Sequence, residues 1–203
     1  MIILEKILWR KNKLLNIDVG GAKNRIMNEL WKVMDSRKSS EFVYDLNSMK
    51  PFELKDNSVD NYYSSMILEH LDRVHLEFVL SEIYRTLKPG GMFRVVVPDI
   101  NVGVKFYLNQ PEKLFTKGCP YQADEILTKF KAGRLISWFY SPDISKSANG
   151  HKMAFDFELL SYFLKKAKFS ETQRSSFHNC IEIFMDRDHE KYKHYALYVN
   201  VIK

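Results

Sequence analysis

Short apolar runs in the first half of the sequence each end near a carboxylate. The residues concerned are Asp18, Asp35, Asp45 and Asp99. If the runs are parallel strands, their carboxyl ends meet at one edge of a sheet, which is where ligands collect. A charge at such an edge loses hydration and is costly unless it binds something, although an aspartate there can also cap the next helix. The set as a whole predicts a ligand site.

A glycine pair after the first run gives this site the character of a nucleoside pocket. Gly20 and Gly21 let the backbone approach a ligand closely, and Asp35 can accept hydrogen bonds from two ribose hydroxyls. The distance from Gly20 to Asp35 is 15 residues, somewhat shorter than the ~20 of dinucleotide folds. The pattern therefore favours a nucleoside without specifying a dinucleotide.

Strands and helices must alternate to position these residues, and the sequence has that pattern. The expected strands are 13–18, 32–35, 41–44, 59–64, 92–97, 171–176 and 195–202, and the expected helices include 22–31, 75–87 and 155–168. The helix 75–87 has one apolar face, and the following Lys-Pro-Gly-Gly run should end it. The β-branched run 92–97 suits a central strand that is buried on both faces.

The expected fold class is α/β, with a Rossmann-like, doubly wound sheet of seven mostly parallel strands and an antiparallel edge strand. The chain reads as a single domain over 1–203, interrupted by an irregular, helical insertion at 101–150 after the fifth strand. Aromatic side chains of the insertion could form a lid over an acceptor or the insertion's own small core. Some of its helices could instead pair two subunits in a homodimer.

Composition limits the classes of function. The 203 residues carry 45% hydrophobic and 28% charged side chains, which are ordinary globular values. No apolar run approaches the ~18–20 residues of a membrane span, and residues 1–13 do not read as a signal peptide. Cys119 and Cys180 lack metal or redox spacing, so we expect free thiols and a cytoplasmic protein.

The net charge of +6 is mild and its basic residues are scattered. A nucleic-acid binder concentrates them in a stripe, so the pattern argues against a nucleic-acid partner. An anionic substrate, such as a phosphorylated or nucleotide-linked metabolite, and a simply solvated surface both remain open.

Three segments carry a resemblance to a known family: 45–71 (with DLNSMKPF and LEHL), 82–100 (with RTLKPGG and VVVPDI) and 150–169. They resemble class I S-adenosylmethionine-dependent methyltransferases. The likeness is greatest to a small bacterial subgroup that is often associated with surface-glycan and lipopolysaccharide biosynthesis. It is specific over 45–99 and weaker elsewhere.

The resemblance implies S-adenosylmethionine as cofactor and assigns roles at its binding site. Gly20 and Gly21 would lie beside the methionine portion, and Asp35 would bond the ribose hydroxyls. Asp45 would accept from the adenine amino group while Leu46 packs on the ring. A further set would complete the site: Ser64 near the transferred methyl, with Glu69, His70 and Asp99 toward the substrate.

The first turn departs from the family's Gly-x-Gly pattern, and two registers are open. In one, Asn16 takes the leading place and Asp18 replaces the first glycine. In the other, Asp18 is the leading acid and Ala22 replaces the last glycine. The segment 35–45 is also too short for a strand, a helix and a strand, so the usual helix after the second strand should be missing or vestigial.

Methyl transfer to a hydroxyl or amine benefits from a general base. His70 is the first candidate because its ordinary pKa is close to neutrality, and Asp99 and His151 are second. Structural alternatives are that His70 bonds backbone at a helix start and that His151 holds a loop. The spacing of the other histidines predicts no metal site.

Three functions are compatible with these features. The favoured one is methyl transfer to a sugar, a nucleotide-linked compound or another small metabolite. A methyltransferase of RNA or protein would account for the positive charge but lacks a basic arm. A non-catalytic relative that binds a partner would account for Asp18 in the cofactor turn.

Overall fold

The computed structural model describes residues 14–21, 30–116, 119–120, 126–140, 150–185 and 187–203. Within them the strands form one seven-stranded sheet in the order β3-β2-β1-β4-β5-β7-β6. Their bounds are β1 (Asn16–Val19), β2 (Trp31–Asp35), β3 (Phe42–Val43), β4 (Val59–Ser65), β5 (Leu87–Pro98), β6 (Glu171–Ser175) and β7 (Ala196–Ile202). β1 to β5 are parallel to one another, and β7 is antiparallel to both β5 and β6. The predicted doubly wound, mostly parallel sheet is confirmed.

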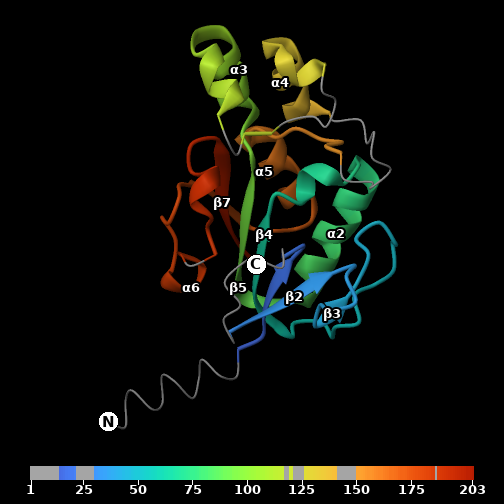
Figure 1. Ribbon diagram of the computed structural model, residues 1–203. Coiled ribbons are helices and arrows are strands. Elements are labelled where there is room, and N and C mark those ends of the chain that lie inside the picture. Colours follow the sequence, from blue (N-terminus) through green and yellow to red (C-terminus); the bar gives the residue numbers. More distant parts are fainter. Residues whose placement is uncertain (1–13, 22–29, 117–118, 121–125, 141–149, 186) are drawn as a thin grey trace.

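The helices of the described residues lie around this sheet (Figure 1). They are α2 (Arg73–Thr86), α3 (Ile100–Asn109), α4 (Lys131–Phe139), α5 (Phe157–Lys166) and α6 (Glu182–Met185), with short 3-10 helices η1 (Leu68–His70), η2 (Pro111–Phe115), η3 (Leu127–Lys129) and η4 (Glu190–Tyr192). The helix predicted at 22–31 falls mostly outside the described residues, but Trp31 belongs to β2. α3 and α4 contact each other beyond the carboxyl ends of β4 and β5, within the predicted insertion (Figure 1).

One face of the sheet is apolar and its helices begin at aspartates. The buried stripe Leu76, Val79, Leu80 and Ile83 of α2 packs in one core with α5 and the inner residues of β1, β4 and β5. Asp72 caps α2 by accepting from the His75 amide at 3.0 Å, and Asp156 caps α5 by accepting from Leu159 at 2.8 Å. The helical periodicity in the sequence therefore identified this face correctly.

α2 ends at Thr86, just before the Lys-Pro-Gly-Gly run that was predicted to end it, but the run itself lies within β5, so the strand begins earlier than expected. β5 starts at Leu87, directly after the helix, and its pairing with β4 is irregular between Val59 and Asn61. Gly90 absorbs the irregularity with a φ of +74°. β3 shrinks to two residues and no helix separates it from β2, in agreement with the short spacing there.

The opposite face is built partly from buried charges. Arg94 of β5 donates to both carboxylate oxygens of Asp188, at 3.0 and 2.5 Å, and both side chains are fully buried. The same guanidinium donates to the side chain of Asn200 and to the carbonyl of Ser176. This pair fastens the connection between β6 and β7, which includes α6, onto the sheet.

Candidate active site

The end of β1 combines a tight turn with a buried ion pair. Gly20 has a φ of +71°, and a Cβ there would lie 2.3 Å from Ile67 Cδ1, so both the conformation and the space require glycine. Asp18 is fully buried and pairs with Arg187, whose side chain is 2% exposed. A Cβ at Gly21 would lie 2.8 Å from Asp18 Oδ2. Asp18, which was predicted to bind the cofactor, thus forms a buried ion pair with another part of the protein.

Asn16, the other leading residue considered for this turn, is also engaged within the sheet. Its amide nitrogen donates to the Leu30 carbonyl, and its oxygen accepts from the Asn61 amide, both at 2.8 Å. Asn16 is fully buried. The contact with Asn61 joins β1 to β4, and the contact with Leu30 joins β1 to the residue before β2, so Asn16 has a structural role at this position.

The end of β2 places Asp35 at the edge of the sheet with a partner close in sequence. Asp35 Oδ1 accepts from Arg37 Nε at 2.8 Å and from the Arg37 amide at 3.0 Å. The Arg37 guanidinium also donates to the Gly21 carbonyl. The Asp35 and Arg37 side chains are 19% and 37% exposed. Arg37 therefore spans the two positions that sequence reasoning assigned to the ribose and the methionine portion.

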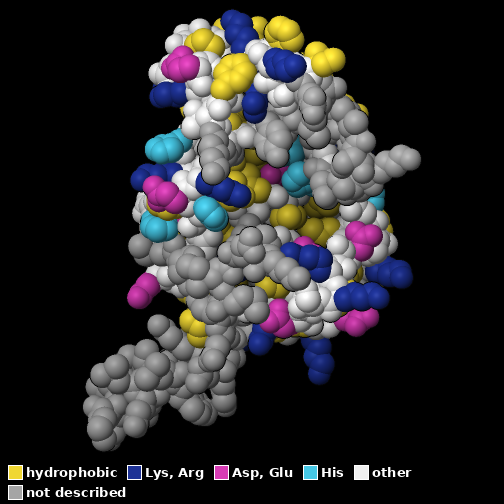
Figure 2. Space-filling view, viewed as in Figure 1, with side chains coloured by type: hydrophobic (Ala, Val, Ile, Leu, Met, Phe, Trp, Pro, Cys, Tyr) yellow, Lys and Arg dark blue, Asp and Glu magenta, His cyan; other side chains and the backbone are white. Residues whose placement is uncertain are grey.

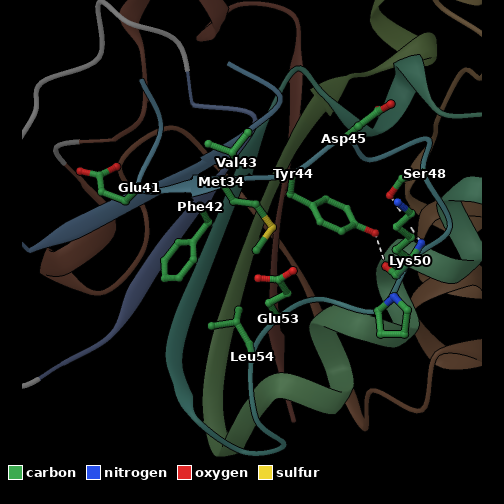
Figure 3. A pocket seen from close by; sticks show the side chains of 11 residues that line it. Met34, Glu41, Phe42, Val43, Tyr44, Asp45, Ser48, Lys50, Glu53 and Leu54 are labelled. Carbon is green, nitrogen blue, oxygen red and sulfur yellow. Dashed lines mark hydrogen bonds between the residues drawn. The ribbon is translucent and has the colours of Figure 1, made fainter. Parts of the chain in front are cut away.

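The segment after β3 forms a turn beside a cavity of about 480 Å³ (Figure 3). Asp45 is exposed, and its carboxylate accepts from the Asn47 amide at 2.9 Å. Figure 3 shows that this carboxylate points away from Tyr44 and Glu53, which face the cavity. Leu46 is half-buried and packs against the main core. Contact of Asp45 and Leu46 with adenine stays a prediction.

The end of β4 supplies a buried hydroxyl. Ser64 is fully buried, and its Oγ has no hydrogen-bond partner among the described residues. Ser64 lies beside Val19 of β1 and Val95 of β5 in the sheet register. Ser64 thus stands near the carboxyl end of β4, as Asp35 stands at the carboxyl end of β2.

Beyond β4, η1 brings two predicted catalytic histidines together with a carboxylate. The His70 and His151 rings lie 4.9 Å apart in an edge-to-face arrangement. Donor atoms of Glu69, His70 and His151 all lie within 4.8 Å of one another. Glu69 is only 1% exposed. Figure 2 shows a hollow on this side of the molecule, between the α3–α4 pair and the β2–β3 edge, with histidine and hydrophobic side chains along it.

Backbone contacts hold this cluster in place. The Glu69 carbonyl accepts from the amides of Lys152 and Met153 at 2.8 and 3.1 Å. His70 Nδ1 lies 3.3 Å from the Gly150 carbonyl. Burial lowers the pKa of His151 to about 4, and the neighbouring His70 acts in the same direction. The His151 ring is therefore neutral near pH 7.

The third predicted catalytic residue, Asp99, is directed elsewhere. Its carboxylate caps α3 by accepting from the Asn101 amide at 3.0 Å and accepts from Arg174 at 2.7 Å. Burial raises the pKa of Asp99, and these two contacts oppose the rise. Asp99 thus anchors the start of the insertion and the edge strand β6.

Sequence reasoning missed the arginines at this edge. Arg37 follows Asp35 by two residues, a spacing that could have indicated the contact. Arg187 lies 169 residues from Asp18, and nothing local to either residue indicated the pair. Sequence reasoning named Glu69 without predicting that His151 would join it.

The comparisons with known proteins agree with the fold. Residues 23–95 match a family described as a methyltransferase domain. A SAM-dependent methyltransferase from Archaeoglobus fulgidus is 13% identical with a TM-score of 0.52, covering 100% of this chain and 92% of that one. One from Mesorhizobium loti is 14% identical with a TM-score of 0.52, covering 100% and 96%.

A third structure is that of the 1,6-didemethyltoxoflavin-N1-methyltransferase of Burkholderia thailandensis, with bound 1,6-didemethyltoxoflavin and S-adenosylhomocysteine. It is 13% identical with a TM-score of 0.51, covering 100% of this chain and 75% of that one. A search of curated proteins gave no match. Among the described residues, no helix has the length and apolarity needed to cross a membrane. Residues 23–95 thus resemble a methyltransferase domain, and the fold of the chain is one that SAM-dependent methyltransferases have.

Proposed function

We propose that the protein is a SAM-dependent methyltransferase that acts on a small acceptor, namely a sugar, a nucleotide-linked compound or another metabolite with a hydroxyl or amine. The observation that supports the proposal is that Asp35 ends β2, Ser64 lies near the end of β4, and the Glu69–His70–His151 cluster is built on η1 directly after β4, all at carboxyl ends of parallel strands, where ligands collect. The likeness of residues 45–100 to the surface-glycan subgroup supports a sugar acceptor.

Two residues at the edge fit the cofactor, Asp35 at its ribose and Ser64 near the transferred methyl. Ser64 offers a buried hydroxyl without a partner in the described part of the chain. Asp35 offers a carboxylate that is open to solvent on one side, so it can exchange Arg37 for two ribose hydroxyls. Ile67 closes over Gly20, and we expect its side chain to line the path of the methionine portion.

S-adenosylmethionine supplies a methyl group on a positively charged sulfur, which is an excellent leaving group. The chain's contribution is to align the acceptor with that methyl and to exclude water. The acceptor's oxygen or nitrogen forms a bond to the methyl carbon while the carbon–sulfur bond breaks and sulfur keeps the electron pair. The acceptor's proton leaves at the Glu69–His70–His151 cluster. We expect this chemistry in the cytoplasm, where Cys119 and Cys180 stay reduced.

A paired measurement on His70→Ala tests this assignment. Calorimetric titration should give nearly wild-type affinity for S-adenosylmethionine, because His70 lies beyond the residues assigned to the cofactor. Turnover of an acceptor found by screening sugars and nucleotide sugars should fall by roughly 10²–10⁴-fold, as expected for loss of proton transfer. The control is His194→Ala, which changes an exposed histidine outside the cluster. Equal losses of affinity and turnover in His70→Ala would make His70 a structural residue.

Absence of cofactor binding would contradict the function itself. If wild-type protein gave neither heat nor a thermal shift at millimolar S-adenosylmethionine, the chain would be a non-catalytic relative of the fold.

A further inference from the structure

We propose that Glu69, His70 and His151 form a binding site for one divalent transition-metal ion of the zinc class. The two imidazoles and the carboxylate each offer one ligand atom, and these atoms lie within 4.8 Å of one another. Tetrahedral metal–ligand bonds of ~2.0–2.2 Å place ligand atoms roughly 3.3–3.6 Å apart, so side-chain rotations must draw the three groups together by about 1 Å to enclose an ion. The sequence predicted no metal because the ligands come from two distant segments.

Each histidine is oriented as metal ligands usually are. His70 Nδ1 faces the Gly150 carbonyl at 3.3 Å. A carbonyl oxygen only accepts, so Nδ1 carries the proton and Nε2 presents its lone pair. The His151 ring likewise contacts backbone at Ser137 and Trp138. A backbone acceptor on one ring nitrogen is the arrangement that fixes the tautomer of a metal-binding histidine and makes the other nitrogen more basic.

The scaffold of the cluster is rigid backbone on both sides. Glu69 holds the segment 150–153 through two hydrogen bonds from the amides of Lys152 and Met153. Phe155, two residues after Met153, forms an isolated β-bridge with Asp99 just after β5. The Phe155 carbonyl accepts a hydrogen bond from the Ile100 amide there. The ligands on η1 and on this segment are therefore held in a common register before any ion arrives.

Burial and donor type indicate which ion fits. The Glu69 side chain is withdrawn from water, and a carboxylate in that position is stabilised by direct contact with a cation. Two nitrogen donors with one oxygen suit Zn²⁺ and related transition metals, whereas Mg²⁺ and Ca²⁺ favour oxygen donors throughout. Three protein ligands leave a coordination position open, as in catalytic zinc sites.

The role of such an ion rests on the proposed function, although the site itself does not. An acceptor hydroxyl in the open position would bind the metal through its oxygen, and the positive charge would lower the pKa of that hydroxyl. With the ion bound, the cluster would serve as ligand instead of base, so the proton would leave to water and the oxygen would be ready to accept the methyl group.

Metal titration of the full chain tests the site without cofactor or acceptor. Protein stripped with a chelator and dialysed should bind one equivalent of Zn²⁺ by calorimetry, and its melting temperature should rise with Zn²⁺. Co²⁺ at the same site should give visible absorption bands with nitrogen and oxygen ligation. Glu69→Gln and His151→Ala should each weaken Zn²⁺ binding by more than ~100-fold, because even partners of the ligands contribute roughly 10–100-fold.

The matched control is His194→Ala, which should keep the wild-type stoichiometry and affinity. Far-ultraviolet circular dichroism establishes that each variant is folded, and His151→Ala stands in if Glu69→Gln does not fold. The site is refuted if Zn²⁺ fails to bind, or if it binds equally well to wild type and to the folded cluster variants. Cofactor affinity is measured separately. Zinc binding without S-adenosylmethionine binding would refute the methyltransferase function alone, and the reverse result would refute the metal site alone.

Discussion

The ends of β1 and β2 each carry an aspartate that pairs with an arginine, yet the two pairs differ in almost every physical respect. Asp18 and Arg187 are 0% and 2% exposed, whereas Asp35 and Arg37 are 19% and 37% exposed. Arg187 comes from the distant connection between β6 and β7, while Arg37 is two residues from its partner. The same Asp–Arg pairing at two neighbouring strand ends therefore differs in burial and in the distance between the partners along the chain.

Burial decides what each carboxylate can do. Exchanging the partner of Asp18 would leave Arg187 charged inside the protein, which is prohibitively costly. Arg37 can turn into solvent at little cost, because partly exposed ion pairs contribute only ~0–1 kcal/mol. Asp18 is thus committed to the fold, and Asp35 remains available to a ligand.

The substitution Asp18→Asn should have the largest effect and tests whether the buried pair stabilises the fold more than the partly exposed pair does. It should lower the free energy of unfolding by ~3–5 kcal/mol, because the Arg187 guanidinium loses its buried counter-charge. Urea unfolding followed by circular dichroism measures the loss. The control is Asp35→Asn, which should cost well under half as much. A stable Asp18→Asn variant that has lost S-adenosylmethionine binding would show that Asp18 is a cofactor ligand after all.

A third pair separates burial from sequence distance. Glu82 is buried like Asp18, but its partner Arg85 is only three residues away. Arg85 donates to the Phe52 and Leu54 carbonyls, and Glu82 accepts from the Phe52 amide at 2.7 Å, so the pair clamps the loop before β4. If burial is the deciding factor, Glu82→Gln should destabilise the protein by roughly 1.5–3 kcal/mol.

The stabilising effect of Glu82 should depend on pH. The hydrogen bond from Arg85 lowers the pKa of Glu82 in the folded protein, with the Phe52 amide acting in the same direction. A lowered folded pKa means that the stabilisation is complete above the unfolded pKa and is lost as pH falls through the folded value. Wild type should lose its advantage over Glu82→Gln in that acidic range. A difference between the two proteins that is constant with pH would exclude the carboxylate charge as the cause.

At the end of β2, Asp35→Ala should leave the stability of the fold nearly unchanged and weaken cofactor binding. We expect affinity for S-adenosylmethionine to fall by ~1–3 kcal/mol, since charged hydrogen bonds to the ribose hydroxyls are lost. Calorimetry with S-adenosylmethionine and with S-adenosylhomocysteine checks this, and an unfolding curve serves as the control. Unchanged affinity would mean that the ribose lies elsewhere.

The same contrast explains how far the sequence could predict the molecule. The sheet, the strand ends and the apolar stripe of α2 follow from local periodicity, so they were accessible to prediction. Asp35 was identified as a strand-end carboxylate for the same local reason. The meeting of His70 with His151 was not accessible, because it depends on the chain returning after the insertion to pair with the Glu69 backbone.

The buried charges on the second sheet face were also beyond local reasoning. Arg94 interrupts an otherwise apolar run, and its counter-charge Asp188 stands in the distant connection between β6 and β7. Buried positions are recognised in a sequence by the periodicity of apolar residues, and an isolated buried charge does not contribute to that periodicity. Asp18 was therefore read as a cofactor ligand on the basis of the turn alone, whereas its arginine became visible only in the fold.

The smallest expected effect belongs to Arg37→Met, and its sign is informative. Removing the guanidinium frees the Asp35 carboxylate and the Gly21 carbonyl, so S-adenosylmethionine no longer has to displace it. Affinity should rise by up to about fivefold, which corresponds to the ~1 kcal/mol at the upper end for such a pair. The increase should vanish in the Asp35→Ala background, because both changes act on one contact. A decrease in affinity would instead mean that Arg37 itself binds the cofactor, through the carboxylate of its methionine portion, and the end of β2 would then contribute a cation as well as an anion to the site.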